Sequence, residues 1–154
     1  EEYGAITVKL DQKAAPVTAA NFVELAEKGF YDGLTFHRII EDFMMQGGAP
    51  KTAEGQAQPI LGEFSSNGVE NDLSHVRGAI SMARTKVKNS ASSQFFIVHQ
   101  DSTYLDGDYA AFGYVTEGLD VVDMVCQTVT PVDGNGTIAE ENQPVIKTIT
   151  IYTE

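Results

Sequence analysis

The stretch of sequence that decides the fold is Phe36-His37-Arg38-Ile39-Ile40-Glu41-Asp42-Phe43-Met44-Met45-Gln46-Gly47-Gly48. Large apolar residues stand on either side of a polar pair, Glu41-Asp42. This pattern predicts two β-strands, residues 34–40 and 43–47, joined by a tight reversal. Because an isolated hairpin is only marginally stable, we expect further strands that join it in a sheet.

Arg38 brings a positive charge among these apolar groups. Alternate side chains of a strand share a face, so Arg38 lies with Phe36 and Ile40, and Met44 lies with Gln46. A guanidinium in such surroundings is costly unless it has a partner or a function. Two interpretations are open at this point: a structural arginine paired with one of the many carboxylates, or the charged group of a binding site.

A second stretch also combines an amide and an aromatic ring on one face. It reads Ser93-Gln94-Phe95-Phe96-Ile97-Val98. Gln94 and Phe96 face one way, whereas Phe95 and Ile97 face the other and are assigned to the core. Two separate strands therefore present a glutamine beside a large apolar side chain.

The composition is that of one acidic globular domain. With 154 residues, of which 42% are hydrophobic, the chain fits a single domain, residues 1–154, with a core. Its formal charge of −12 disfavours nucleic acid and anionic membranes as partners. The single cysteine, Cys126, excludes an internal disulfide and is assigned to the core. No apolar run approaches the ~20 residues that a membrane-spanning helix needs.

The start of the chain bears on its location. It begins at Glu1 rather than at a methionine, so we expect that a segment preceding it was either removed or not included in the chain. We expect a cytoplasmic protein and leave open an exported or lipid-anchored form. We also expect a monomer.

Periodic segments elsewhere predict five more strands and two helices. The strands are residues 4–10, 79–83, 94–98, 111–115 and 145–152, and the helices are residues 16–28 and 119–127. Residues 49–60 and 84–92 are predicted to be surface loops. Many short strands with few helices favour an all-β barrel or sandwich, and the pattern itself does not choose between the two.

Several of these blocks resemble the cyclophilin-type peptidyl-prolyl isomerases and occur in that family's order. They are residues 36–40 and 43–48, Gly78-Ala79-Ile80-Ser81-Met82-Ala83, residues 93–97, Leu105-Asp106-Gly107, Ala111-Phe112-Gly113 and Asn21-Phe22. The resemblance runs from about Gly4 to Tyr152, and many spaced blocks are far more specific than one motif. The form Ser-Met-Ala-Arg-Thr is similar to bacterial members.

The resemblance implies a fold, an activity and a site. The fold is all-β, a closed eight-stranded antiparallel barrel capped by two helices, and the activity is cis–trans isomerisation of X–Pro bonds that assists protein folding. Proline-containing peptides and unfolded protein clients are the implied partners, and no cofactor or metal is expected. The implied catalytic residues are Arg38 and Gln46. The implied substrate-binding residues are Phe43, Met44, Ala83, Arg84, Gln94, Phe96, Tyr104, Leu105 and Tyr109.

The chemistry of this residue set suits the implied reaction. Rotation about an X–Pro bond meets a barrier of ~18–20 kcal/mol, which comes from amide resonance and requires neither nucleophile nor metal. A fixed guanidinium, which keeps its proton at ordinary pH, can donate a hydrogen bond to the pyramidal nitrogen of the twisted amide. Strict alternation puts Phe43 opposite Met44, so the turn at Asp42 must twist the chain if both are to contact one ligand.

The histidines do not suggest another chemistry. His37, His75 and His99 are scattered without the spacing of metal ligands, and no Ser-His-Asp arrangement is evident. We interpret His37 as a hydrogen-bonded structural histidine and the other two as loop or strand-end residues.

Three positions depart from the family pattern. Tyr104 stands where the best-known members have tryptophan, Tyr109 where many have histidine, and Arg84 where asparagine is usual. The tryptophan indole contacts the drug cyclosporin in those members, so only weak cyclosporin binding is expected here. The departures bear on peptide preference more than on catalysis.

Two other functions compete with the isomerase. A proline-binding module would need the aromatic pocket but no central arginine, whereas a small-molecule-binding barrel would need a wide apolar interior. A separate alternative applies to Phe43, Met44, Phe96 and Leu105, since apolar alternation alone also fits ordinary core residues. Arg38 together with Gln46 and Gln94 favours the enzyme.

Overall fold

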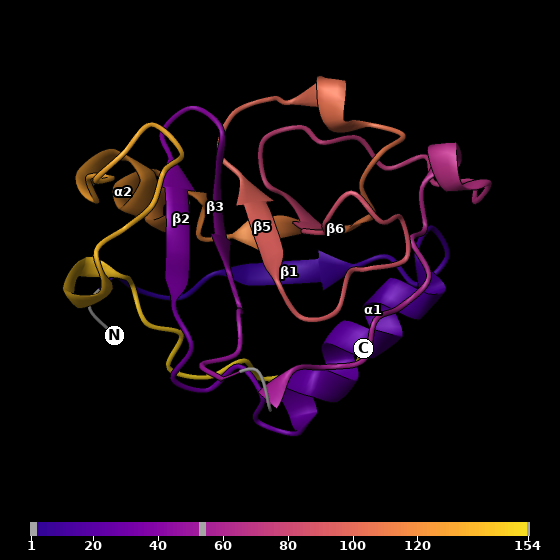
Figure 1. Ribbon diagram of the computed structural model, residues 1–154, viewed down its shortest axis with the longest axis horizontal. Helices are drawn as coiled ribbons and strands as arrows, with labels where there is room; N and C mark the ends of the chain where they lie inside the picture. Colours follow the sequence, from indigo (N-terminus) through magenta and orange to yellow (C-terminus); the bar gives the residue numbers. More distant parts are fainter. Residues whose placement is uncertain (1–2, 53–54, 154) are drawn as a thin grey trace.

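A computed structural model describes residues 3–52 and 55–153 as one mixed structure of strands and two helices (Figure 1). The helices are α1 (Pro16–Glu27) and α2 (Leu119–Thr128), and short 3-10 turns are η2 (Ser65–Asn67), η3 (Thr103–Leu105) and η4 (Glu140–Asn142). The strands are β1 (Thr7–Leu10), β2 (Phe36–Ile40), β3 (Met44–Gly47), β4 (Ala79–Met82), β5 (Phe95–Val98) and β6 (Ala111–Glu117). No helix within these described residues is long and apolar enough to cross a membrane.

The six strands form one antiparallel sheet in the order β1-β6-β4-β5-β3-β2. The predicted hairpin is β2 paired with β3, and its register places Arg38 opposite Gln46. Gln46 in turn lies opposite Phe96 of β5, and Phe96 lies opposite Ser81 of β4. These four residues form a row across the sheet, which we call the site row.

The neighbouring row points to the other face of the sheet and belongs to the core. It consists of Ile39, Met45, Ile97 and Ile80, all buried and paired in register across the same strands. Helix α1 adds Phe22, Leu25 and Ala26 to this core, and α2 adds Val122, Val125 and Cys126. The alternation of the strands thus separates a core face from a site face, as the sequence pattern predicts.

Helix α1 begins without a capping side chain of its own. Pro16 occupies the first turn, and Ala15 at the N-cap position offers no side-chain acceptor. The acceptor comes from far away in the sequence: Glu63, which is only 2% exposed, accepts hydrogen bonds from the backbone N–H and the Oγ1 of Thr18, both at 2.6 Å. A carboxylate here satisfies a free N–H and faces the positive end of the helix dipole. Gly29, at φ 74°, follows the last turn.

The predicted C-terminal strand, residues 145–152, is wrong. Residues on both sides of η4 instead run beside β2 and the residues that precede it. The N–H of Ile138 donates to the carbonyl of His37 in β2, and the N–H of Ile146 donates to that of Leu34, before β2. Only isolated bridges, Thr35 with Val145 and Arg38 with Thr137, result. The turn η4 between these two contacts prevents a continuous ladder, and beyond Ile146 the imperfect alternation is satisfied by packing onto the core rather than by pairing.

The closed eight-stranded barrel is therefore not confirmed. The sheet has six strands, and the described residues show no hydrogen-bonded pairing between its outer strands, β1 and β2. The predicted loop at residues 84–92 contains no α-helix or strand, and neither does the predicted loop at residues 49–60 in its described part; residues 53 and 54 lie outside it.

Candidate functional site

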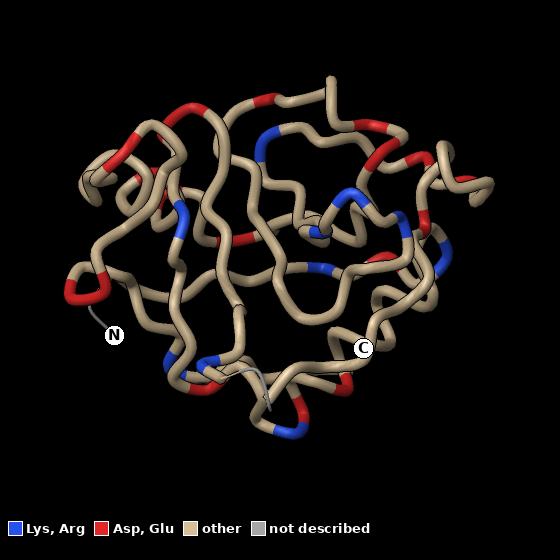
Figure 2. Tube along the Cα trace, in the orientation of Figure 1, with Lys and Arg blue, Asp and Glu red and all other residues tan. Residues whose placement is uncertain are grey.

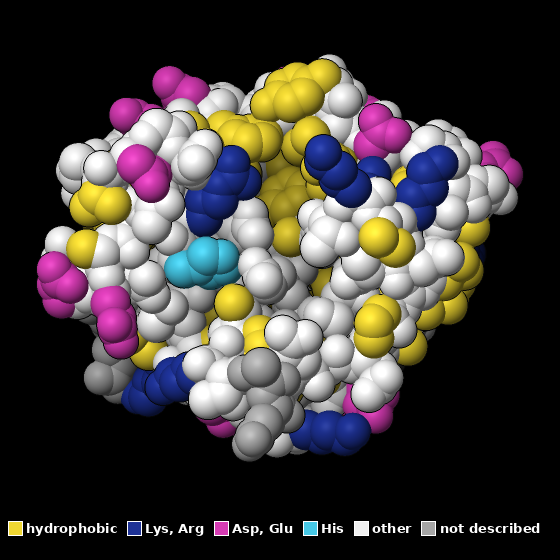
Figure 3. Space-filling view, viewed as in Figure 1, with side chains coloured by type: hydrophobic (Ala, Val, Ile, Leu, Met, Phe, Trp, Pro, Cys, Tyr) yellow, Lys and Arg dark blue, Asp and Glu magenta, His cyan; other side chains and the backbone are white. Residues whose placement is uncertain are grey.

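A pocket of about 160 Å³ opens over the site row. It is lined by Arg38, Phe43, Met44, Gln46, Ala83, Arg84, Phe96, Leu105 and Tyr109. All nine are residues that the sequence predicts for the site. Figure 3 shows the hollowed face of the molecule, with hydrophobic side chains on the floor of the hollow and basic side chains on either side.

The floor of the pocket belongs to a small apolar cluster, separate from the main core. Met44, Ala79, Phe96 and Val98 are its buried members, and Phe43, Leu105 and Tyr109 pack against it half-buried. Phe96 and Met44 are both core-like and pocket-lining, which explains why their pattern also fits ordinary burial. A floor of this kind offers a small apolar ring a dry surface.

The turn before β3 turns Phe43 towards Met44. Asp42 adopts a left-handed conformation, φ 66°, so the strict alternation expected from the sequence is interrupted there. Its N–H donates to Nδ1 of His99 at 2.9 Å, and Nε2 of that ring donates to Asp123 of α2 at 3.1 Å. His99 thus ties the turn to a helix, and Phe43 reaches the same pocket as Met44.

Arg38 is held by neutral acceptors. Its Nε donates to the backbone carbonyl of Asn135 at 2.7 Å, and its Nη1 donates to Oε1 of Gln46 at 3.4 Å. Gln46 donates in turn to Oε1 of Gln94 at 2.9 Å. No carboxylate within the described residues forms an ion pair with Arg38. The interpretation of Arg38 as half of a structural ion pair is therefore wrong, because no carboxylate of the described residues compensates its charge.

Gln94 and Tyr104 do not line the pocket. Gln94 lies behind Gln46 and fixes it. Tyr104, in η3, is 71% exposed, and its ring centroid lies 6.0 Å from that of Phe43. Both residues therefore contact residues that line the pocket but do not form its wall themselves.

A hydrogen-bonded series of Ser81, His75 and Asp106, which the sequence analysis does not identify, lies beneath Phe96. Nδ1 of His75 donates to Asp106 at 2.8 Å, and the hydroxyl of Ser81 donates to Nε2 at 2.8 Å. His75 and Ser81 are fully buried, so no substrate reaches the Ser81 hydroxyl and it does not act as a nucleophile. The imidazole instead stacks on Phe96, with ring centroids 5.9 Å apart, and joins β4 to the residue after η3. Its members are 31 and 6 residues apart, which no motif spacing reveals.

His37 differs from its interpretation. The structure shows no hydrogen bond to its half-buried ring from the described residues, and its Nδ1 is buried without a partner. Burial, and then the positive charge of Arg38, lower the pKa of His37 below 6.5. Burial also lowers the pKa of His75, although Asp106 opposes the shift.

These histidines predict that stability decreases in mild acid. As the pH falls below the ordinary histidine pKa of 6.5, the unfolded chain takes up protons that the folded protein does not bind, so the free energy of unfolding decreases. The midpoint of urea unfolding should decrease from about pH 7 to about pH 5. His75→Gln, which keeps a donor and an acceptor, should show a shallower decrease. A midpoint that is constant or rises over this range would contradict the prediction.

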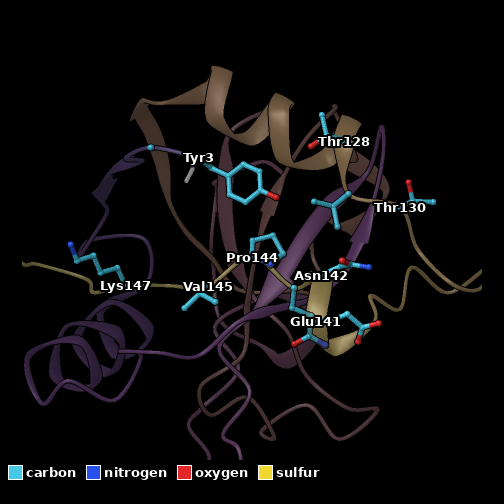
Figure 4. A pocket seen from close by; sticks show the side chains of 11 residues that line it. Tyr3, Thr128, Thr130, Glu141, Asn142, Pro144, Val145 and Lys147 are labelled. Carbon is cyan, nitrogen blue, oxygen red and sulfur yellow. The ribbon is translucent and has the colours of Figure 1, made fainter. Parts of the chain in front are cut away.

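A larger hollow, of about 720 Å³, lies elsewhere. Figure 4 shows its lining side chains, from Tyr3, from the end of α2 at Thr128 and from the segment around Pro144. None of the predicted site residues lines it. Polar side chains dominate its wall. We therefore assign the function to the smaller pocket.

The fold and the smaller pocket define a class: a β-sheet protein whose apolar pocket, edged by an unpaired guanidinium, suits a small apolar ring attached to a polar backbone. The family model of the cyclophilin type peptidyl-prolyl cis-trans isomerases matches residues 1–153. The chain belongs to this family, and it is accordingly an isomerase of peptidyl-prolyl bonds.

Relatives and solved structures agree with this family. The chain is 42% identical over 132 residues to peptidyl-prolyl cis-trans isomerase A of Dickeya dadantii, covering 82% of this chain and 68% of that protein. It is 34% identical over 157 residues to isomerase B of Escherichia coli, covering 97% and 94%. A cyclophilin type isomerase of Cryptosporidium parvum, solved in the presence of the dipeptide Ala-Pro, superposes with a TM-score of 0.83 at 28% identity, covering 99% and 95%.

Proposed function

We propose that the pocket holds the proline ring of extended or unfolded polypeptide segments and that Arg38 stabilises the twisted X–Pro amide. The observation that supports this is the position of Arg38: its guanidinium edges an apolar pocket, is fixed by Asn135 and Gln46, and has no carboxylate partner in the described chain. The presence of Ala-Pro in the Cryptosporidium structure concerns that protein and agrees with a proline-binding pocket.

The proposed mechanism uses one hydrogen bond that is strongest in the transition state. As the amide twists, resonance is lost and the proline nitrogen becomes pyramidal and able to accept a hydrogen bond. Arg38 can donate to that nitrogen, whereas the planar ground states offer no such acceptor, so the interaction lowers the barrier rather than only tightening binding. Gln46 has a positioning role in this scheme, because it holds Nη1 of Arg38 and is itself held by Gln94.

The assay that tests this function is cis–trans exchange of a short X–Pro peptide, followed by NMR. Catalysed exchange should shorten an uncatalysed process of tens to hundreds of seconds. Peptide binding without faster exchange would instead identify a proline-binding module. If the protein neither binds the peptide nor accelerates its exchange, the assignment of the pocket is refuted. A chelator should leave the rate unchanged, because no step of the mechanism uses a metal.

We further propose that the C-terminal segment closes the sheet towards a barrel. Its contacts with the edge of β2, the burial of Ile146 and the packing of Ile149 and Ile151 on the main core support this. Slow amide hydrogen exchange is expected at Ile146, because its N–H donates to the backbone carbonyl of Leu34. Exchange as fast as in an exposed loop would contradict it.

Cyclosporin should bind weakly, and Tyr104→Trp should tighten its binding. A phenol and an indole donate from different positions, so a contact built for an indole N–H leaves a polar group unpaired at a cost of about 1–3 kcal/mol. Because Tyr104 is mostly exposed and does not line the pocket, turnover of a short peptide should change much less. Titration of both proteins with the drug, beside one peptide assay, tests this. Unchanged drug affinity in the variant would show that Tyr104 has no part in drug binding.

A further inference from the structure

Arg84 is a second fixed guanidinium on the wall of the same pocket. It follows β4 and lies between two aromatic rings, with its Cζ 4.8 Å from the ring centroid of Phe64 and 4.9 Å from that of Tyr109. Its Nε donates to the backbone carbonyl of Asp108 at 2.8 Å, and its Nη1 donates to that of Thr85 at 2.9 Å. A third, longer hydrogen bond runs from Nη1 to the backbone carbonyl of Lys86 at 3.5 Å. Ring stacking and these three neutral acceptors hold the side chain in one place while leaving its charge uncompensated.

The Nη2 of Arg84 remains available to a ligand. It donates no hydrogen bond within the described residues, and no carboxylate of that part of the chain, including the neighbouring Asp108, forms an ion pair with Arg84. Arg38 and Arg84 thus bring two unpaired charges to a pocket of about 160 Å³. The pocket is a positive site in a chain of net charge −12, whose acidic residues are spread along the whole trace in Figure 2.

We propose that Arg84 makes the enzyme prefer substrates in which an acidic residue, Glu or Asp, immediately precedes the proline. This rests on the proposed function, which places the proline nitrogen beside Arg38. The preceding residue is bonded to that nitrogen, so its side chain leaves the pocket close to the rim. Arg84 is the other cationic group that lines the pocket, and a carboxylate can accept a hydrogen bond from its free Nη2.

The size of the preference follows from how exposed the ion pair between Arg84 and the peptide carboxylate is to water. Arg84 is half-buried and a bound peptide carboxylate remains near water, so kcat/KM for Glu–Pro over Gln–Pro should be raised about two- to five-fold. The net negative charge of the protein opposes an acidic peptide at long range, but that repulsion is screened beyond about 8 Å at physiological salt. The contact itself weakens with added salt, so the ratio should decrease towards one as the ionic strength rises.

The test compares Glu–Pro and Gln–Pro peptides of otherwise identical sequence. Wild-type enzyme should show the two- to five-fold ratio, and Arg84→Gln should bring it close to one. Arg84→Lys, which keeps the charge but loses the planar fork, should lie between the two. Lys86→Gln removes a nearby cation that does not line the pocket and should keep the wild-type ratio.

The outcomes separate the two claims. A wild-type ratio at or below one, a ratio that persists in folded Arg84→Gln, or a ratio lost equally in Lys86→Gln would overturn the role of Arg84 while the isomerase assignment stands. Failure to accelerate either peptide would refute the proposed function and this inference with it.

Discussion

Arg38→Lys should reduce kcat/KM for a short X–Pro peptide by about 10²–10³-fold, although the charge is kept. Loss of one preorganised donor to a transition state costs about 2.7–4 kcal/mol. The planar fork of Arg38 bonds the Asn135 carbonyl and Gln46 at the same time, whereas a lysine ammonium is a mobile, strongly hydrated donor that cannot reproduce both contacts.

The exchange assay on wild type and Arg38→Lys, each checked for native circular dichroism, measures this effect. Lys13→Arg serves as a control. It exchanges the same two residue types in the other direction at an exposed position outside the pocket, and it should keep the wild-type rate. Gln46→Ala should cause a smaller loss, since it removes only one of the contacts that hold Arg38. Near wild-type turnover in a folded Arg38→Lys protein would mean that Arg38 is structural.

Glu63→Ala should cost about 2–5 kcal/mol of unfolding free energy and lower the melting temperature by roughly 5–15 °C. The buried carboxylate accepts two hydrogen bonds from Thr18, and its removal leaves a backbone N–H and a hydroxyl unpaired in the interior. Each buried group left in this state costs about 1–3 kcal/mol. Because α1 has no capping side chain of its own, nothing local replaces the lost acceptor.

Urea unfolding of three variants tests this role. Glu63→Gln keeps an oxygen acceptor and should lose less than Glu63→Ala. Glu70→Ala removes an exposed carboxylate from the same region and should stay within about 0.5 kcal/mol of wild type. If Glu63→Ala matches Glu70→Ala, the cap is not what holds the start of α1.

The part of the site that the sequence predicts depends on local periodicity. Alternation along two strands places Arg38 with its apolar neighbours and Gln94 with Phe96, and the resemblance supplies the other pocket residues. The pairing of Arg38 with Gln46 and of Gln46 with Phe96 depends on register, which the hairpin turn and the buried face fix only in the folded sheet.

The features that the sequence does not predict arise from contacts between distant segments. The chain from Ser81 through His75 to Asp106, the capping of α1 by Glu63 and the stacking of Arg84 between two rings each join residues from separate elements or loops. The prediction of a C-terminal strand is wrong although the local pattern exists. The alternating residues Ile149 and Ile151 pack onto the core, and their segment does not pair with a neighbouring strand.

The backbone carbonyl of Asn135, which holds Arg38, is synthesised after the whole pocket lining. Every residue that lines the pocket, from Arg38 to Tyr109, lies upstream of it, and 97 residues separate it from the arginine that it holds. A nascent chain that ends before Asn135 would contain the whole pocket lining, yet its guanidinium would have lost the acceptor of its Nε–H. We therefore expect catalytic competence late in translation, once the segment along β2 has docked.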